Sequence, residues 1–247
     1  MISLCCPSRG RPKLAQRLVK TALETISNAG NVEILFYLNE DDPELEMYKQ
    51  LLDPKFYTVG PHQSTCLSWN ELAEKSNGDI VFLAGDDIQF QTKDWDLEIQ
   101  KAFELHDDRI CMVIPWDCNI KGKGYKFKDE TKPVYIGDES IGAPHFAVHK
   151  NWIKNLGYFA PPFFWHWYVD SYTQKVSRKL DRCILLPHVR VKAKKVFDET
   201  AELIRKKNNI AKRDDWVWTK VRDRHLDADV DTLRSFIESY PNLSRTE

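Results

Sequence analysis

Short apolar runs alternate with segments of helical periodicity along most of the chain. The runs end at polar or turn-forming residues, which is typical of strands that are buried on both faces of a sheet. We expect strands at Ile2–Cys6, Val32–Leu38, Phe56–Val59, Ile80–Leu83, Cys111–Trp116, Val134–Ile136, Ala143–His149 and Arg182–Pro187.

The intervening segments predict helices. Apolar residues recur at helical spacing at Leu14, Leu18, Ala22 and Ile26, around Leu45–Leu51, and over Ser64–Ser76, Trp95–Leu105 and Trp152–Leu156. Residues 198–240 predict two or three further helices without strands between them. The pattern therefore predicts an α/β domain over residues 1–195 and a helical C-terminal extension over residues 196–247.

The composition is ordinary for a globular protein, with 42% hydrophobic and 30% charged residues. No apolar run approaches the roughly 18 to 20 residues of a membrane span. Arg9, Arg11 and Lys13 interrupt the N-terminal apolar stretch, so we expect that this stretch is not a signal peptide. The six cysteines lack metal-ligand spacing and predict buried free thiols in a reducing compartment, so we expect a cytoplasmic protein.

Charge is distributed unevenly along the chain. Residues 1–110 contain 11 Lys and Arg against 19 Asp and Glu, a difference of −8, whereas residues 171–224 contain 16 against 7, a difference of +9. A basic segment of this kind is either a solvated helical face or a phosphate-binding surface. Charge alone does not distinguish the two.

Two adjacent carboxylates, Asp86 and Asp87, follow the expected strand Ile80–Leu83. Ligands of open α/β sheets bind at the carboxyl ends of the strands. Paired acids repel each other unless a cation or hydrogen-bond donors lie between them, and oxygen ligands suit Mg²⁺ or Mn²⁺. The alternative interpretation is an acidic turn that caps the next helix.

Two other strand ends carry polar residues. The first strand runs into the basic loop Pro7-Ser8-Arg9-Gly10-Arg11-Pro12, whose arginines suit phosphate or carboxylate partners. This loop lacks the glycine-rich fingerprints of dinucleotide-binding and P-loop proteins. The second strand ends at Asn39-Glu40-Asp41-Asp42, where a carboxylate could accept from a nucleobase or a ribose, or cap the next helix.

Eight of the fifteen residues in Tyr158–Tyr172 are aromatic. His166 and Asp170 are four positions apart and would share one face of a helix. Burial among aromatic rings raises the pKa of a carboxyl group, which favours a general base. A general base and a structural carboxylate both fit Asp170. His188, just after the last expected strand, is either structural or a third metal ligand.

Taken together, these landmarks resemble the GT-A glycosyltransferases of the family-2 type over roughly residues 1–200. The likeness lies in the opening strand and loop, in the segment Ser68–Leu83 that precedes Gly85-Asp86-Asp87, and in Leu156–Phe159 followed by Asp170. The first acid of the family's Asp-x-Asp motif is replaced by Ala84. The N-terminal Pro-Ser-Arg-Gly-Arg-Pro and the Gly-Asp-Asp are also similar to glycosyltransferases of tailed phages.

The resemblance implies a Rossmann-like, mixed and mostly parallel sheet that binds a nucleoside diphosphate sugar, with a UDP-sugar favoured. It implies Mn²⁺ or Mg²⁺ on Asp86, Asp87 and His188, and inversion with Asp170 as the base. The remaining candidates are residues for the donor and for the acceptor. Donor-binding candidates are Pro7, Ser8, Arg9, Arg11, Asn39, Glu40, Asp42, Asn70 and Asp86; acceptor-binding candidates are His145, Trp165, His166 and Trp167.

The acceptor hydroxyl belongs either to a hydroxymethylated DNA base or to a saccharide, because aromatic rings with basic flanks stack on both bases and sugars. The loop at residues 121–132 is a candidate lid. Two other functions are compatible with the same pattern. One is a sugar nucleotidyltransferase, and the other is a non-catalytic module that binds nucleotide sugars. If the protein is phage-encoded, its location is the host cytoplasm.

Overall fold

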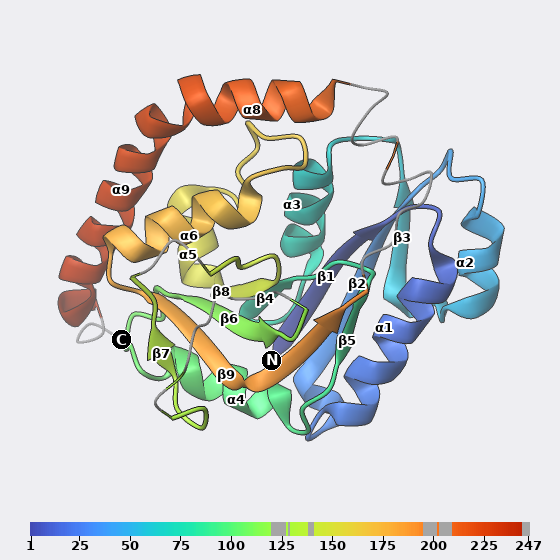
Figure 1. Ribbon diagram of the computed structural model, residues 1–247, viewed down its shortest axis with the longest axis horizontal. Helices are drawn as coiled ribbons and strands as arrows, with labels where there is room; N and C mark the ends of the chain where they lie inside the picture. Colours follow the sequence, from blue (N-terminus) through green and yellow to red (C-terminus); the bar gives the residue numbers. More distant parts are fainter. Residues whose placement is uncertain (120–126, 128, 138–140, 195–201, 203–208, 244–247) are drawn as a thin grey trace.

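A mixed sheet forms the centre of the part of the chain that the computed structural model describes, which comprises residues 1–119, 127, 129–137, 141–194, 202 and 209–243 (Figure 1). Eight of its nine strands follow the order β3-β2-β1-β4-β8-β6-β9-β5, and the ninth, β7, pairs with β9. Their bounds are β1 Ile2–Ser8, β2 Val32–Asn39, β3 Tyr57–Gly60, β4 Ile80–Leu83, β5 Ile88–Phe90, β6 Met112–Asp117, β7 Val134–Tyr135, β8 Phe146–His149 and β9 Cys183–Ala193.

Helices cover both faces of the sheet. Buried apolar side chains of α1, α2 and α4 form one core with one face, and those of α3, α5, α6, α8 and α9 form a second core on the other. Alternate residues of β2 enter the two cores, as the two-residue period of a strand requires. The helices are α1 Pro12–Thr25, α2 Leu45–Leu51, α3 Thr65–Lys75, α4 Trp95–Phe103, α5 Lys150–Leu156, α6 Val169–Lys179, α8 Ile210–Lys220 and α9 Arg222–Leu243.

Strand direction brings distant segments to one edge of the sheet. β1 is parallel to β2 and β4, and β8 is antiparallel to both β4 and β6. β6 is parallel to β9. The carboxyl ends of β1, β2, β4, β6 and β9 therefore meet at the same edge as the start of β8. The expected mixed, mostly parallel sheet is confirmed.

The last long strand differs from the prediction. Pro187 was expected to end it, but β9 continues to Ala193. Its pairing with β6 shifts in register between Pro115 and Trp116, where Leu186 and then Arg190 are the partners. A bulge tolerates proline because the local ladder hydrogen bond is already missing. Beyond the bulge, β9 also pairs with β5, a strand that the sequence analysis missed.

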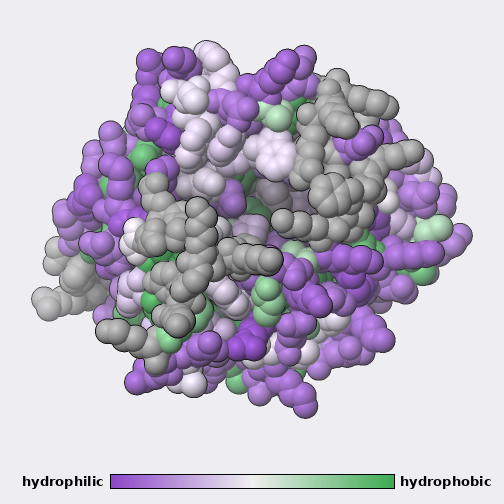
Figure 2. All heavy atoms as spheres, in the orientation of Figure 1, coloured by the Kyte–Doolittle hydropathy of each residue, from purple (hydrophilic) through white to green (hydrophobic). Residues whose placement is uncertain are grey.

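The C-terminal helices pack on the second core. α9 contacts α5 and α6, and the Asp229 carboxylate accepts hydrogen bonds from the hydroxyls of Tyr158 and Tyr172. Most of the expected lid at 121–132, and the expected domain boundary after residue 195, lie outside the described residues. No helix in the described ranges has the length and apolar character needed to span a membrane. Hydrophilic residues dominate the face shown in Figure 2, apart from its grey atoms.

Candidate active site

A chain of hydrogen bonds fixes the acidic turn after β4 to the end of β1. The backbone N–H of Arg11 donates to the Tyr48 hydroxyl at 2.9 Å, and that hydroxyl lies 2.6 Å from Ser8 Oγ. Ser8 Oγ donates to Asp86 Oδ2 at 2.7 Å. Since Ser8 has one proton and gives it to Asp86, Tyr48 must be the donor to Ser8. The chain holds the Asp86 carboxylate, which is only 6% exposed, at the carboxyl edge of the sheet.

Asp86 also has a cationic partner. Arg11 Nη1 lies 3.3 Å from Asp86 Oδ1, and both side chains are largely buried. The structure therefore brings together Ser8, Arg11 and Asp86, three of the donor-binding candidates, and their binding role stays a prediction. Tyr48 was expected only as an apolar helix residue, and no sequence signal indicated that its hydroxyl would join this network.

The acidic cluster after β2 supports the same loop. Asp42 Oδ2 accepts from the backbone N–H of Gly10 at 2.9 Å, where φ is +67°, a conformation that favours glycine. Asp41 pairs with Arg9 at 2.5 Å, which lowers the pKa of Asp41. Asp42 and Arg9, both predicted to bind the donor, thus shape the basic loop in this structure.

The other three donor candidates near this edge differ in their surroundings. Asn39 donates to the carbonyl of Pro61 at 3.4 Å and is largely buried. Glu40 is exposed. Pro7 lies within β1 opposite Tyr37 of β2. All three remain at or next to the carboxyl edge.

Asp87 lies close to two further titratable side chains, those of Asp117 and His145. Burial, and then the charge of Asp86, raise the pKa of Asp87 to about 6, and Asp117 at the end of β6 acts in the same direction. A Cβ atom at Gly85 would lie 2.8 Å from Asp87 Oδ1 and 3.3 Å from His145 Cε1, so the side chains of Asp87 and His145 both lie close to the backbone of Gly85. Burial lowers the pKa of His145 to about 4, and its Nδ1 has no partner among the described residues.

These residues fit a divalent cation by their chemistry. Asp86 and Asp87 are adjacent carboxylates whose mutual repulsion a cation would relieve. Among the described residues, no group of three or more His, Cys, Asp or Glu side chains surrounds one point. Mg²⁺ commonly binds one or two carboxylates together with substrate phosphates, so such a group is not required.

His188 does not lie beside this pair. It belongs to β9, with its Nε2 3.0 Å from Glu98 Oε2 on α4, and its carbonyl accepts from Thr92. The prediction assumed that β9 ended at Pro187, which would have brought His188 to the carboxyl edge. Ala193, not His188, lies opposite Ile88 next to the acidic turn. The expected metal-ligand role of His188 is therefore not supported by its contacts.

The aromatic segment, residues 158–172, packs against α3 through His166. His166 Nδ1 lies 2.9 Å from Thr65 Oγ1, and its ring stacks on Trp69 with centroids 6.5 Å apart. Burial lowers the pKa of His166 to about 4, and the Arg11 guanidinium acts in the same direction. His166 is thus within electrostatic reach of the residue that pairs with Asp86.

Asp170 lies in the first turn of α6, which begins at Val169. His166 precedes this helix, so the condition under which His166 and Asp170 would share one helical face, a helix over both residues, is not met. Tyr168 precedes it with φ +69° and interrupts the helical geometry. Burial raises the pKa of Asp170, whose Oδ1 accepts from the backbone N–H of Ser171 at 2.7 Å.

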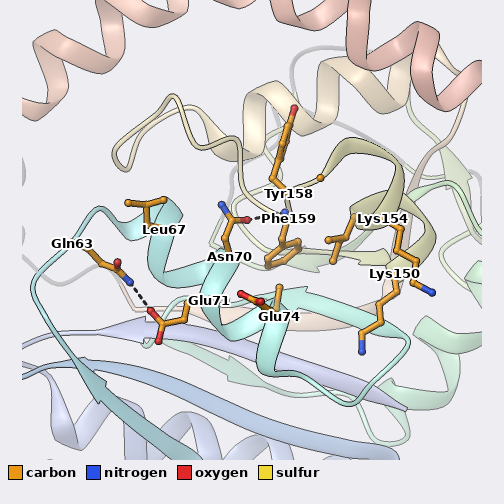
Figure 3. Close-up of a pocket in the computed structure, with 12 residues that line it drawn as sticks. Gln63, Leu67, Asn70, Glu71, Glu74, Lys150, Lys154, Tyr158 and Phe159 are labelled. Carbon is orange, nitrogen blue, oxygen red and sulfur yellow. Dashed lines mark hydrogen bonds between the residues drawn. The ribbon is translucent and has the colours of Figure 1, made fainter.

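Asn70 hydrogen-bonds to the backbone of residues 159 and 160 and also lines a cavity. Its Oδ1 accepts from the N–H group of Phe159 at 2.8 Å (Figure 3). The same oxygen accepts from the N–H of Ala160 at 2.8 Å, and Nδ2 donates to the carbonyl of Ala160 at 2.8 Å. The Asn70 amide thus has three backbone hydrogen bonds in this structure, and its role in donor binding stays a prediction. Asn70 links α3 to the start of the aromatic segment.

A cavity of about 760 Å³ lies between α3, α5 and the turn at 157–159 (Figure 3). Glu71 and Glu74 line it opposite Lys150 and Lys154. Lys150 follows the carboxyl end of β8, which runs antiparallel to β4, so this part of the cavity lies at the sheet edge opposite to Asp86. The cavity is therefore distinct from the acidic turn.

Comparisons with known proteins identify the fold. No family model and no curated protein sequence matches the chain. Its structure is similar to S. aureus TarS 1-349 in complex with UDP-GlcNAc, with a TM-score of 0.59, 13% identity, and coverage of 98% of this chain and 91% of that chain. The chain spans 41% of a longer S. aureus TarS structure.

Two further structures agree. The mannosyltransferase PcManGT from Pyrobaculum calidifontis, in complex with GDP-Man and Mn²⁺, has a TM-score of 0.59 and 11% identity, with 95% of this chain and 74% of that chain covered. GalNAc-T7 with UDP, GalNAc and Mn²⁺ has a TM-score of 0.54 and 15% identity, with 78% and 43% covered. The chain therefore has the GT-A glycosyltransferase fold that its sequence predicted.

Proposed function

We propose that the protein is a glycosyltransferase that moves a sugar from a nucleoside diphosphate sugar to a hydroxyl acceptor. The observation that carries the proposal is the network of Ser8, Arg11 and Asp86 at the carboxyl edge of a GT-A sheet. Fold likeness alone does not define an activity. Here a buried carboxylate, a guanidinium and a second acid converge where α/β sheets bind ligands.

Arg11 is the residue best placed to bind the diphosphate of the donor. Its guanidinium is charged at all relevant pH values and suits phosphate oxygens. In the described structure it pairs with Asp86, so a phosphate would replace or share that partner. Asn39 and Glu40, at the end of β2, are our candidates for the nucleoside. UDP is the favoured nucleotide, since UDP or a UDP-sugar is bound in two of the similar structures.

Asp86 and Asp87 would hold Mn²⁺ or Mg²⁺. When bound, such an ion supplies positive charge that stabilises the leaving diphosphate. Arg11 adds a fixed positive charge at the same edge, and the Ser8–Tyr48 hydrogen bonds keep the Asp86 carboxylate oriented.

Asp170 is our candidate for the general base that takes the proton from the acceptor hydroxyl. Burial raises its pKa, which brings the carboxylate closer to the basicity that proton transfer near neutral pH requires. Attack from the side opposite to the diphosphate inverts the anomeric carbon. His145, Trp165, His166 and Trp167 would line the acceptor side, where a hydroxymethylated DNA base and a saccharide are the two candidates.

A thermal-shift panel tests the proposal. UDP, GDP, UDP-GlcNAc and GDP-mannose are added with and without Mn²⁺, and at least one should raise the melting temperature in a Mn²⁺-dependent manner. Asp86→Ala should abolish that shift, whereas Asp79→Ala, an exposed acid, should retain it. The absence of any shift in the wild type would contradict the proposal. Pyrophosphate release from a nucleoside triphosphate and a sugar phosphate would indicate a nucleotidyltransferase instead.

A further inference from the structure

A carboxylate of the C-terminal helices accepts hydrogen bonds from three consecutive backbone N–H groups in the aromatic segment, residues 158–172. Asp214 of α8 accepts hydrogen bonds from the N–H groups of Trp165, His166 and Trp167, each at 2.8 Å. Its side chain is completely buried, and Arg213 Nη1 lies 3.0 Å from the same carboxylate. Consecutive N–H groups that point at one anion form a backbone nest, and a charged acceptor strengthens each bond.

Other contacts fix the two ends of the same segment. Asn70 binds the backbone of Phe159 and Ala160, and Asp229 accepts from the hydroxyls of Tyr158 and Tyr172. The stretch between these anchors, residues 161–171, contains the three N–H groups that Asp214 binds. Asp214 therefore holds three consecutive backbone N–H groups in the middle of the segment, where the Trp165 carbonyl also accepts from the N–H of Cys66 at 3.3 Å and the Tyr168 hydroxyl donates to Asp215.

The path of this stretch determines where two site candidates lie. The His166 ring contacts Thr65 and Trp69 and is within electrostatic reach of Arg11. Trp167 is followed directly by Tyr168, whose φ of +69° starts α6 and so places Asp170. A shift of the backbone at residues 165–167 would move both His166 and the first turn of α6.

We propose that Asp214 is a positioning residue, which holds the acceptor side of the active site by filling the backbone nest at residues 165–167 without touching the substrate. This inference rests on the proposed glycosyltransferase function. The structural part of the inference can nevertheless be tested without any substrate.

Amide hydrogen exchange tests the contact directly. In Asp214→Asn one carboxylate oxygen becomes an NH₂ group that faces backbone N–H donors, so at least one hydrogen bond is lost. We expect exchange at residues 165–167 to rise by about 10- to 100-fold, as the loss of a charge-assisted hydrogen bond implies. Asp231→Asn, an exposed acid on α9 paired with Arg234, should leave these amides unchanged. Unchanged exchange in Asp214→Asn would overturn the proposal.

Asp214→Glu provides the answer if Asp214→Asn does not fold. It keeps the charge but adds a methylene, so exchange should increase at residues 165–167 more than in the rest of the second core. A uniform increase across the protein would indicate general destabilisation and would overturn the positioning role.

Turnover and binding then separate positioning from substrate contact. With UDP-GlcNAc or GDP-mannose and Mn²⁺, we expect Asp214→Asn to lower kcat by about tenfold or more, while the Kd for UDP or GDP stays within about twofold of the wild type. Equal losses in both quantities, or no loss of kcat, would overturn the proposal. If the wild type binds neither nucleotide, the proposed function fails, and the exchange experiment still decides the role of Asp214.

Discussion

Replacement of Asp87 by Asn should stabilise the protein at neutral pH when divalent cations are absent. Burial and the neighbouring Asp86 carboxylate raise the pKa of Asp87 from 3.8 to about 6. The folded state therefore binds this proton more tightly than the unfolded state, and ionisation of Asp87 destabilises the fold. The penalty is absent below about pH 4, grows between about pH 4 and 6, and is complete above about pH 6.

The size of the effect follows from the pKa. A rise of about two units corresponds to about 3 kcal/mol of unfolding free energy above pH 6, at about 1.36 kcal/mol per unit. An asparagine cannot ionise and avoids this penalty. Unfolding entropy of about 2.1 cal/mol/K per residue gives about 0.5 kcal/mol/K for 247 residues. The melting temperature of Asp87→Asn should therefore exceed that of the wild type by about 6 °C at pH 7.

Thermal or urea unfolding of both proteins at pH values from 4 to 8, in the presence of a chelator, measures this difference. The advantage of Asp87→Asn should grow with pH up to about 6 and then remain constant. Asp79→Asn, an exposed acid, serves as the control and should show no such growth. A difference that does not change with pH would refute the reasoning. Addition of Mn²⁺ should reduce the difference by stabilising only the wild type.

Three further substitutions test other parts of the site. Asn70→Ala leaves the N–H groups of residues 159 and 160 without their acceptor and should lower the unfolding free energy, measured in urea, by about 2 to 4 kcal/mol. The control Asn155→Ala loses one hydrogen bond on α5 and should lower it by less than about 1 kcal/mol. Equal losses in the two variants would contradict the role of Asn70 in holding residues 159 and 160. Asp170→Asn should reduce sugar transfer by about 100-fold or more while calorimetry finds UDP affinity within about twofold of the wild type, and a parallel loss of affinity would exclude a general base. Arg11→Ala should weaken UDP binding by about tenfold, since it removes a charged partner of phosphate. Lys13→Ala, on the exposed side of α1, should leave UDP binding unchanged. Equal UDP affinities of the two variants would exclude Arg11 from the donor site.

The edge of the sheet was predictable because its signals are local. Asp86 directly follows an apolar run, and the loop with Ser8 and Arg11 directly follows another. Parallel strands bring such ends together without any knowledge of side-chain contacts. This reasoning predicted the cluster of Ser8, Arg11 and Asp86 but not its hydrogen-bond partners.

The partners that were missed come from distant parts of the chain. The apolar spacing of α2 explains why Tyr48 is buried, but it does not indicate that its hydroxyl reaches Ser8. Asp214 looks like one of many charged residues in a basic helical segment, and only the tertiary structure brings it to residues 165–167. The position of His188 was predicted wrongly because a proline such as Pro187 usually ends a strand. The register shift between β9 and β6 that accommodates Pro187 cannot be recognised in a single sequence.

The main chain of Asp87 has a consequence separate from its side chain. Its carbonyl oxygen accepts from Arg17 Nη2 of α1 and from the backbone N–H of Lys194, each at 2.9 Å. One backbone atom thus joins the acidic turn, the first helix and the exit of β9. Substitutions at Arg17 would disturb the acidic turn through this backbone hydrogen bond, whereas Arg11 contacts the Asp86 carboxylate itself. Likewise, the exit of β9 is tied to the acidic turn both through this carbonyl and through the pairing of Ala193 with Ile88, so a displacement of Lys194 would be transmitted to the acids.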